Sequence, residues 1–133
     1  MGELLVYIDR SEILPGKLEE LKGAASELVR FVSEHEPQLI SYGIYLDQEA
    51  SAMTVVAIHP NSASMEFHLA VGAPEFRKVG RHIDLRLIEV FGDPSETVVE
   101  QLEQKARTLG KHGHVVRHEL VAGFTRFPTD RPG

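Results

Sequence analysis

The chain has 133 residues, of which 42% are hydrophobic and 26% are charged. This is the usual composition of one globular domain, so it excludes a disordered protein and leaves no room for two well-formed cores. The formal net charge of −6 opposes binding to nucleic acid or to an anionic membrane.

The sequence contains no cysteine. Disulfide scaffolds, thiolate metal sites and cysteine nucleophiles are therefore excluded, and the composition fits a cytoplasmic protein. The residues after Met1 form no basic segment followed by a long apolar run, so no signal peptide is expected. No apolar stretch approaches the ~20 residues that a membrane-spanning helix needs.

The first half of the chain alternates between strand and helix patterns. Residues 3–9 are apolar on both faces of a predicted strand. Apolar residues at three- and four-residue steps then predict a helix up to about residue 34, which Pro37 ends: Leu18, Leu21, Ala25, Leu28 and Val32. Residues 39–46 and 52–59 are predicted as two strands joined by a polar hairpin connection.

In the second half, Asn61 is predicted to cap a short helix that ends near residue 71, with a further helical turn over 74–79. Residues 82–91 are predicted as a strand. Its apolar alternation changes phase near Leu87, which indicates a β-bulge.

The C-terminal part adds one helix and one strand. Asp93 is predicted as the N-cap, Pro94 as the first helical residue and Gly110 as the stop. Residues 114–126 are predicted as a last strand and residues 127–133 as a flexible tail.

This order of elements predicts an α+β protein. The first six elements follow the split βαβ pattern of the ferredoxin-like fold, in a single domain over residues 1–126 with the extra C-terminal helix and strand. Helices can cover only one face of such a sheet, yet the strands are apolar on both faces. We therefore expect a homodimer, in which a second copy covers the other face and forms a dimeric α+β barrel.

Three short motifs resemble the dimeric α+β-barrel superfamily and, within it, the antibiotic-biosynthesis-monooxygenase domain. They are Pro15-Gly16-Lys17 before the first helix, Glu36-Pro37 followed by Tyr42, and His68 on the helix after the third strand. The sequence departs from the family pattern elsewhere. Ala57 and His59 stand where the family often has Glu and an aromatic residue, Gln38 replaces a Gly, and the chain has no tryptophan.

The resemblance implies a barrel cavity that holds a small aromatic, quinol or polyketide-like substrate. It also implies oxygen chemistry without flavin or metal, so no cofactor is expected. Fold analogy does not select the reaction, because the superfamily also contains other enzymes and members without demonstrated activity. A non-catalytic module that binds a small molecule, or a structural dimer, are the alternatives.

His68 and His59 are the predicted catalytic residues. His68 shares a helical stripe with Met65 and Leu69, so it faces inward, where a neutral imidazole can accept a proton from a phenolic substrate. His59 ends the third strand and can share that site. The competing interpretation is two hydrogen-bonded histidines that only pack. No third ligand is evident nearby, so no metal site is predicted.

A second set of residues is predicted to contact the substrate. The phenols Tyr7 and Tyr45 lie on predicted strands, and Phe67 flanks the short helix. Asp84 and Arg86 alternate on one face of the fourth strand, where Arg86 can bind an acidic substrate. For the aromatic residues packing is the competing interpretation, and for the charged pair it is a partly wet sheet edge.

Overall fold

The computed structural model describes residues 3–126, and it contains one five-stranded sheet and four helices. In chain order the elements are β1 (Leu5–Ile13), α1 (Leu18–His35), β2 (Ser41–Leu46), β3 (Ala52–His59), α2 (Ser62–Val71), α3 (Ala73–Gly80), β4 (Ile83–Phe91), α4 (Glu96–Leu109) and β5 (His114–His118). The tail predicted over residues 127–133 lies outside the described residues.

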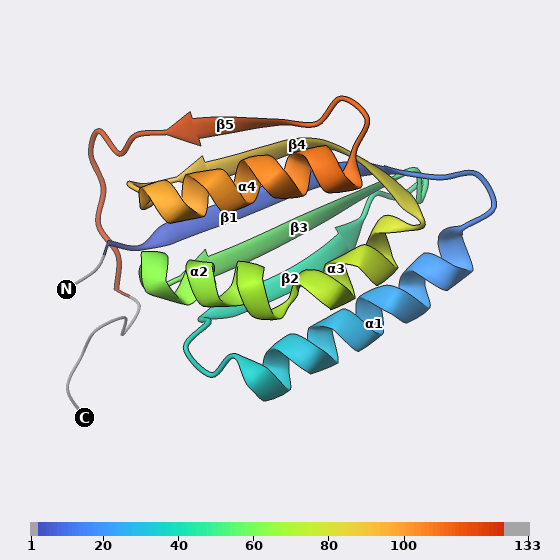
Figure 1. Cartoon of the computed structure of the whole chain (residues 1–133), viewed down its shortest axis with the longest axis horizontal. Helices are drawn as coiled ribbons and strands as arrows, with labels where there is room; N and C mark the ends of the chain where they lie inside the picture. Colours follow the sequence, from blue (N-terminus) through green and yellow to red (C-terminus); the bar gives the residue numbers. More distant parts are fainter. Residues whose placement is uncertain (1–2, 127–133) are drawn as a thin grey trace.

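The sheet order is β2-β3-β1-β4-β5. The first four strands pair antiparallel, and β5 joins β4 in parallel after the α4 crossover. This confirms the ferredoxin-like split βαβ arrangement with an added helix and strand. All the helices lie on one face of the sheet, with α1 beside α3 and α2 beside α4 (Figure 1).

The β-bulge predicted near Leu87 is confirmed. Arg10 of β1 pairs with Leu87 of β4, but the next residue, Ser11, pairs with Leu85, so Arg86 is the extra residue. Because one inserted residue reverses the side-chain alternation, Ile83, Leu85, Ile88 and Val90 all point into the core.

Three element boundaries differ from the predictions. β1 extends to Ile13 instead of residue 9, because it is a central strand whose backbone is hydrogen-bonded to β3 and β4 beyond its apolar run. β5 ends at His118 instead of residue 126. His118 pairs with Phe91, the last residue of β4, and the pairing between the two strands ends there.

The third difference is the start of α4. The N-cap is Ser95, not Asp93, because the Ser95 hydroxyl accepts the Val98 backbone N–H at 3.2 Å. Asn61 caps α2 as predicted, since its side chain accepts the Ser64 N–H at 2.9 Å.

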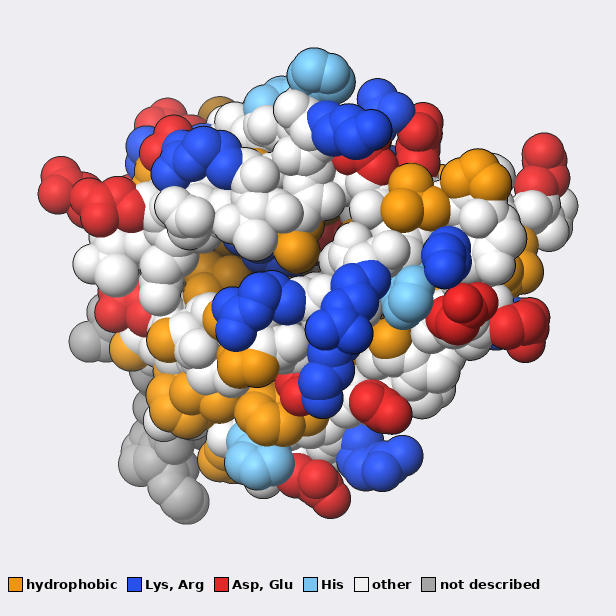
Figure 2. All heavy atoms as spheres, turned by 45° about the vertical axis from the view of Figure 1, so that its right-hand side comes forward, with side chains coloured by type: hydrophobic (Ala, Val, Ile, Leu, Met, Phe, Trp, Pro, Cys, Tyr) orange, Lys and Arg blue, Asp and Glu red, His pale blue; other side chains and the backbone are white. Residues whose placement is uncertain are grey.

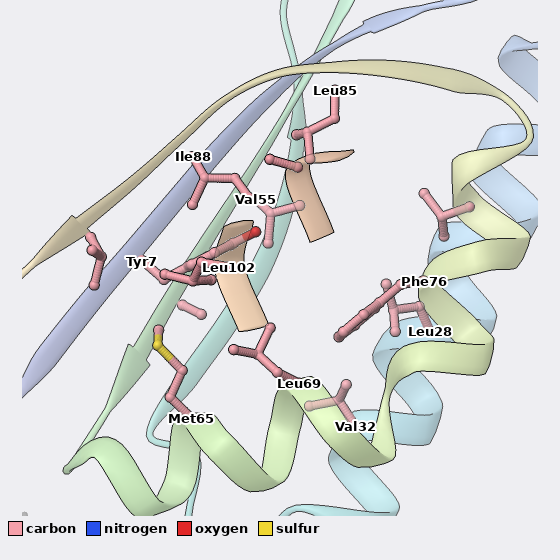
Figure 3. Close-up of a cluster of buried hydrophobic side chains, with 14 of the residues drawn as sticks. Tyr7, Leu28, Val32, Val55, Met65, Leu69, Phe76, Leu85, Ile88 and Leu102 are labelled. Atoms are coloured by element: carbon pink, nitrogen blue, oxygen red, sulfur yellow. The ribbon is translucent and has the colours of Figure 1, made fainter. Parts of the chain in front are cut away.

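The hydrophobic core fills the space between the sheet and the helices (Figure 3). Its completely buried members come from every layer and include Leu5, Met65, Leu85, Ile88 and Leu102. Within residues 3–126, none of the helices combines the length and the apolar character that crossing a membrane would require.

Candidate functional site

Polar residues interrupt this core on the inner face of β1. Leu5, Tyr7, Asp9 and Ser11 alternate along the strand and all point toward the helices. Asp9 is only 3% exposed. A buried carboxyl group is costly unless it has partners, and such groups gather at functional sites.

The partners of Asp9 form a compact unit that we call the lysine cluster: Tyr7, Asp9 and Lys105. The Tyr7 hydroxyl donates to Asp9 Oδ2. Lys105 Nζ, which reaches into the core from α4, donates to Tyr7 Oη at 2.9 Å and lies 3.7 Å from Asp9 Oδ2. Two hydrogen bonds and one ion pair therefore connect the three side chains beneath the helices.

Burial shifts the proton affinities within the lysine cluster. Burial raises the pKa of Asp9, although the charge of Lys105 opposes this shift. Burial likewise lowers the pKa of Lys105, with Asp9 opposing. Burial and the neighbouring Asp9 raise the pKa of Tyr7 well above its usual value, so its hydroxyl stays protonated at neutral pH and donates.

A second unit, the histidine cluster, consists of Glu36, His59, Ser64 and His68. His68 Nδ1 lies 2.7 Å from Glu36 Oε1 and 2.9 Å from Glu36 Oε2. A carboxylate only accepts, so Nδ1 carries the proton and Nε2 carries the lone pair. His59 Nδ1 lies 2.9 Å from Ser64 Oγ, and the two imidazole rings are 5.4 Å apart.

Each imidazole in the histidine cluster has one nitrogen without a hydrogen-bond partner among the described residues. Within the described part of the chain, Nε2 of His59 and Nε2 of His68 are buried without a hydrogen-bond partner, as is Asp9 Oδ1. Buried polar atoms are normally satisfied. Three unsatisfied atoms in one region of the core are the arrangement expected where a polar ligand binds.

Both histidines are held neutral. Burial lowers the pKa of His59 to about 3, with His68 and Lys105 adding to the effect. Burial also lowers the pKa of His68, against the opposing influence of Glu36. A neutral His68, oriented by a carboxylate and with Nε2 open, has the chemistry of a general base.

A pocket of about 590 Å³ opens above the lysine cluster, between α4 and the α2–α3 pair. Lys105, Leu69 and Phe76 line it. In the space-filling view, a recess with hydrophobic side chains lies between ridges of charged and polar atoms (Figure 2). The Lys105 side chain is therefore part of the wall of this pocket.

Phe76 connects the pocket with both clusters. Its ring centre lies 4.1 Å from Lys105 Nζ and 5.0 Å from the centre of the His68 ring. The centre of the Tyr42 ring lies 5.2 Å from that of His68. In Figure 3, Tyr7 points from β1 and Phe76 from α3 into the same space between sheet and helices.

The structure brings His59 and His68 together in the histidine cluster, places Tyr7 in the lysine cluster and leaves the other predicted site residues elsewhere. Tyr45 is 60% exposed on β2. Phe67, which is 48% exposed, lines a separate pocket of about 330 Å³ beside Glu36 and Ser64.

Asp84 and Arg86 form surface ion pairs. Arg86 lies 2.6 Å from Glu12 Oε1 and 3.2 Å from Asp84 Oδ2, while Asp84 Oδ1 accepts the Lys111 backbone N–H at 3.0 Å. These contacts join β1, β4 and the turn after α4. The substrate-binding roles of Tyr45, Phe67, Asp84 and Arg86 stay predictions, outside both clusters.

The sequence reasoning did not single out Asp9 or Lys105, and it noted Glu36 only within a motif. The positions of Asp9 and Lys105 in the sequence nevertheless indicate that both side chains face the core. Asp9 continues the Leu5–Tyr7 alternation, and Lys105 falls three residues after Leu102 in the buried stripe of α4. Among the described residues, no group of three or more His, Cys, Asp or Glu side chains could hold a metal ion.

The sheet order and the placement of the helices define an α+β fold, and solved structures described as antibiotic biosynthesis monooxygenases share it. An antibiotic biosynthesis monooxygenase superimposes with a TM-score of 0.57 at 20% identity, covering 65% of this chain and 94% of its own. SnoaB, a cofactor-independent oxygenase from Streptomyces nogalater, gives 0.59 at 10% identity, covering 70% and 95%.

MupZ from Pseudomonas fluorescens matches over a longer stretch. Its TM-score is 0.72 at 16% identity, and the match covers 94% of this chain and 96% of MupZ. No protein-family model matches the sequence, and no curated protein matches it. At these identities the similarity shows the shared fold.

Proposed function

We propose that the protein is a cofactor-independent monooxygenase-type enzyme that acts on a small aromatic, quinol or polyketide-like substrate. The observation that carries this proposal is the His68–Glu36 contact of 2.7 Å, which leaves a buried Nε2 lone pair without a hydrogen-bond partner among the described residues. The printed description of SnoaB as a cofactor-independent oxygenase supports the same class of reaction for a protein of this fold.

In the proposed reaction, His68 Nε2 takes a proton from the acidic O–H or C–H of the substrate. The resulting anion gives an electron to O2, and the two radicals combine into a hydroperoxide. Loss of water then converts a CH2 group into C=O. One oxygen atom ends in the carbonyl and the other in water, and the substrate supplies all the electrons.

The residues around His68 suit these steps. Glu36 stabilises the imidazolium that forms when Nε2 takes the proton. The Phe76 and Tyr42 rings, at 5.0 Å and 5.2 Å from the imidazole, offer faces against which an aromatic substrate can pack. Burial excludes water, which otherwise protonates the anion.

Oxygen consumption with a panel of hydroquinones and anthrones tests this proposal. We expect turnover by the wild type and a loss of roughly 10²–10⁴-fold in His68→Gln, which removes the base. His112→Gln, at an exposed histidine, is the matched control and should retain the full rate.

An absence of turnover across the panel, or an unchanged rate in His68→Gln, would contradict the proposal. In that case a thermal-shift screen with the same compounds tests the alternative function, a non-catalytic module that binds a small molecule. A compound that raises the melting temperature without being turned over indicates a module that binds a small molecule.

The proposal includes a cytoplasmic homodimer. The outer face of the sheet carries the half-buried apolar residues Val6, Ile8, Val56 and Ile58, and none of the helices within residues 3–126 covers it (Figure 1). A second copy packed on this face would remove the apolar surface from water and close the barrel.

A further inference from the structure

The Lys105 amine is not used by the proposed oxygenation. Its side chain is 10% exposed, whereas those of Lys17, Lys22 and Lys78 are 45%, 53% and 49% exposed. Lys105 nevertheless lines the 590 Å³ pocket. It therefore combines a mostly dry environment with access to a small molecule.

The surroundings of Nζ provide an acid next to the amine. Tyr7 accepts from Nζ at 2.9 Å and donates to Asp9, so a hydrogen-bonded path connects amine and carboxyl. The centres of the Phe76 and Tyr7 rings lie 4.1 Å and 4.8 Å from Nζ. Burial acts on Asp9 and Lys105 in opposite directions, and both shifts favour a neutral amine beside a neutral carboxyl.

We propose that Lys105 is a nucleophile that forms a Schiff base with an aldehyde or ketone bound in this pocket. The Nζ lone pair attacks the carbonyl carbon, and the carbonyl oxygen leaves as water. One proton of that water comes from Asp9 through Tyr7 and the other from the lysine nitrogen. The protonated imine then remains paired with the Asp9 carboxylate, and no oxidant or reductant takes part.

Other charged groups also influence this amine. Arg77 from α3, together with Glu100, Glu103 and Arg107 from α4, lines the same pocket. The positive charges favour a neutral amine, whereas the acidic groups and the face of Phe76 favour the ammonium form. Asp9 and His59 act from the sheet side and His68 acts from α2, so the pH dependence of the amine reflects all of these groups.

The test is reductive labelling with benzaldehyde and cyanoborohydride at pH 7, followed by mass spectrometry of the peptides. Burial lowers the pKa of Lys105 and so leaves more of its amine neutral at pH 7. We therefore expect Lys105 to be labelled at least ~10-fold faster than the exposed Lys78. Lys105→Arg, whose guanidinium is a hydrogen-bond donor that forms no imine, should remove this label and leave the labelling of Lys78 unchanged.

Tyr7→Phe tests the acid. It removes the hydroxyl between amine and carboxyl, so labelling of Lys105 should slow while Lys78 reacts at its former rate. An unchanged rate at Lys105 would overturn the role of Tyr7. Labelling of Lys105 no faster than Lys78 in the wild type would overturn the whole inference.

The inference and the proposed oxygenation fail independently. Labelling needs neither oxygen nor His68, so His68→Gln should keep a fast-reacting Lys105 even when it consumes no oxygen. Oxygen turnover with an unreactive Lys105 would overturn the Schiff-base inference alone.

Discussion

His59 is buried completely, with Nδ1 against Ser64 and Nε2 without a partner in the described part of the chain. An imidazole in this position cannot take up a proton without placing an unpaired charge in the core. The unfolded chain has no such restriction, because there the pKa of a histidine is about 6.5. This difference links protonation to folding.

The prediction for His59 follows from the sign of the shift. Burial lowers its pKa to about 3 in the folded protein, so between these values the unfolded state binds the extra proton. Stability is then complete above about pH 6.5 and falls as the pH drops, by up to ~1.4 kcal/mol per pH unit. Urea unfolding at pH 7, 6 and 5 measures this slope.

His59→Gln should make that slope shallower, because glutamine does not titrate. His112→Gln, at an exposed position, is the control and should keep the wild-type slope. Equal slopes in His59→Gln and the wild type would show that His59 protonates without cost in the folded state.

The same residues show what a sequence can say about a site. His68 was predicted to face inward, because it shares a helical stripe with Met65 and Leu69, and it is buried in the structure. His59 and Tyr7 are buried as well. Which side chains meet there depends on packing between distant elements. Lys105 lies 98 residues from its partner Tyr7, and no local pattern encodes that distance.

At the scale of elements, Gly110 shows why a correct prediction can have a different physical cause. The residue ends α4 as predicted, but with φ −140° and ψ 154° it is extended and not left-handed. The requirement for glycine comes from a close approach instead. A Cβ at this position would lie 1.9 Å from the backbone oxygen of Leu85.

Gly110→Ala should therefore destabilise the protein by ~2–3 kcal/mol, since the backbone of β4 must move to avoid the methyl group. Gly23→Ala is the matched control. Gly23 is exposed within α1 and nothing would meet its Cβ within 4 Å, so alanine should stabilise the helix by ~0.5–1 kcal/mol. Urea unfolding compares both variants, and equal effects would contradict the close-approach explanation.

Most elements were predictable because each has a periodic apolar face that the core requires. The α1 stripe of Leu21, Leu28 and Val32 and the alternation of Met53 and Val55 in β3 are buried as their spacing predicts. The end of β5 was not predictable. Residues 119–126 look as strand-like as 114–118, but only the latter find a hydrogen-bonding partner in β4.

At the scale of the whole molecule, the segment after β5 extends the apolar outer surface. Leu120, Val121 and Phe124 are 61%, 93% and 81% exposed. Together with Leu4, Val6 and Phe91 they line a pocket of about 580 Å³ at one end of the outer sheet face. Contiguous exposed apolar residues of this kind mark surfaces that associate.

The proposed dimer uses both the outer sheet face and this segment, so charge placed on either should dissociate it. Light scattering should give twice the 14.8 kDa of one chain for the wild type at micromolar concentration. Val56→Glu and Val121→Glu would each bury an unpaired carboxylate at the interface, and either should weaken dimerisation by at least ~100-fold.

Because Val121 lies outside the sheet, its variant leaves the β-strand pairing intact. Ser26→Glu, on the exposed face of α1, should dimerise as the wild type does. A wild-type mass of one chain would mean that the outer face stays open in solution. Dimers in all three variants would mean that the interface of the dimer lies on another surface.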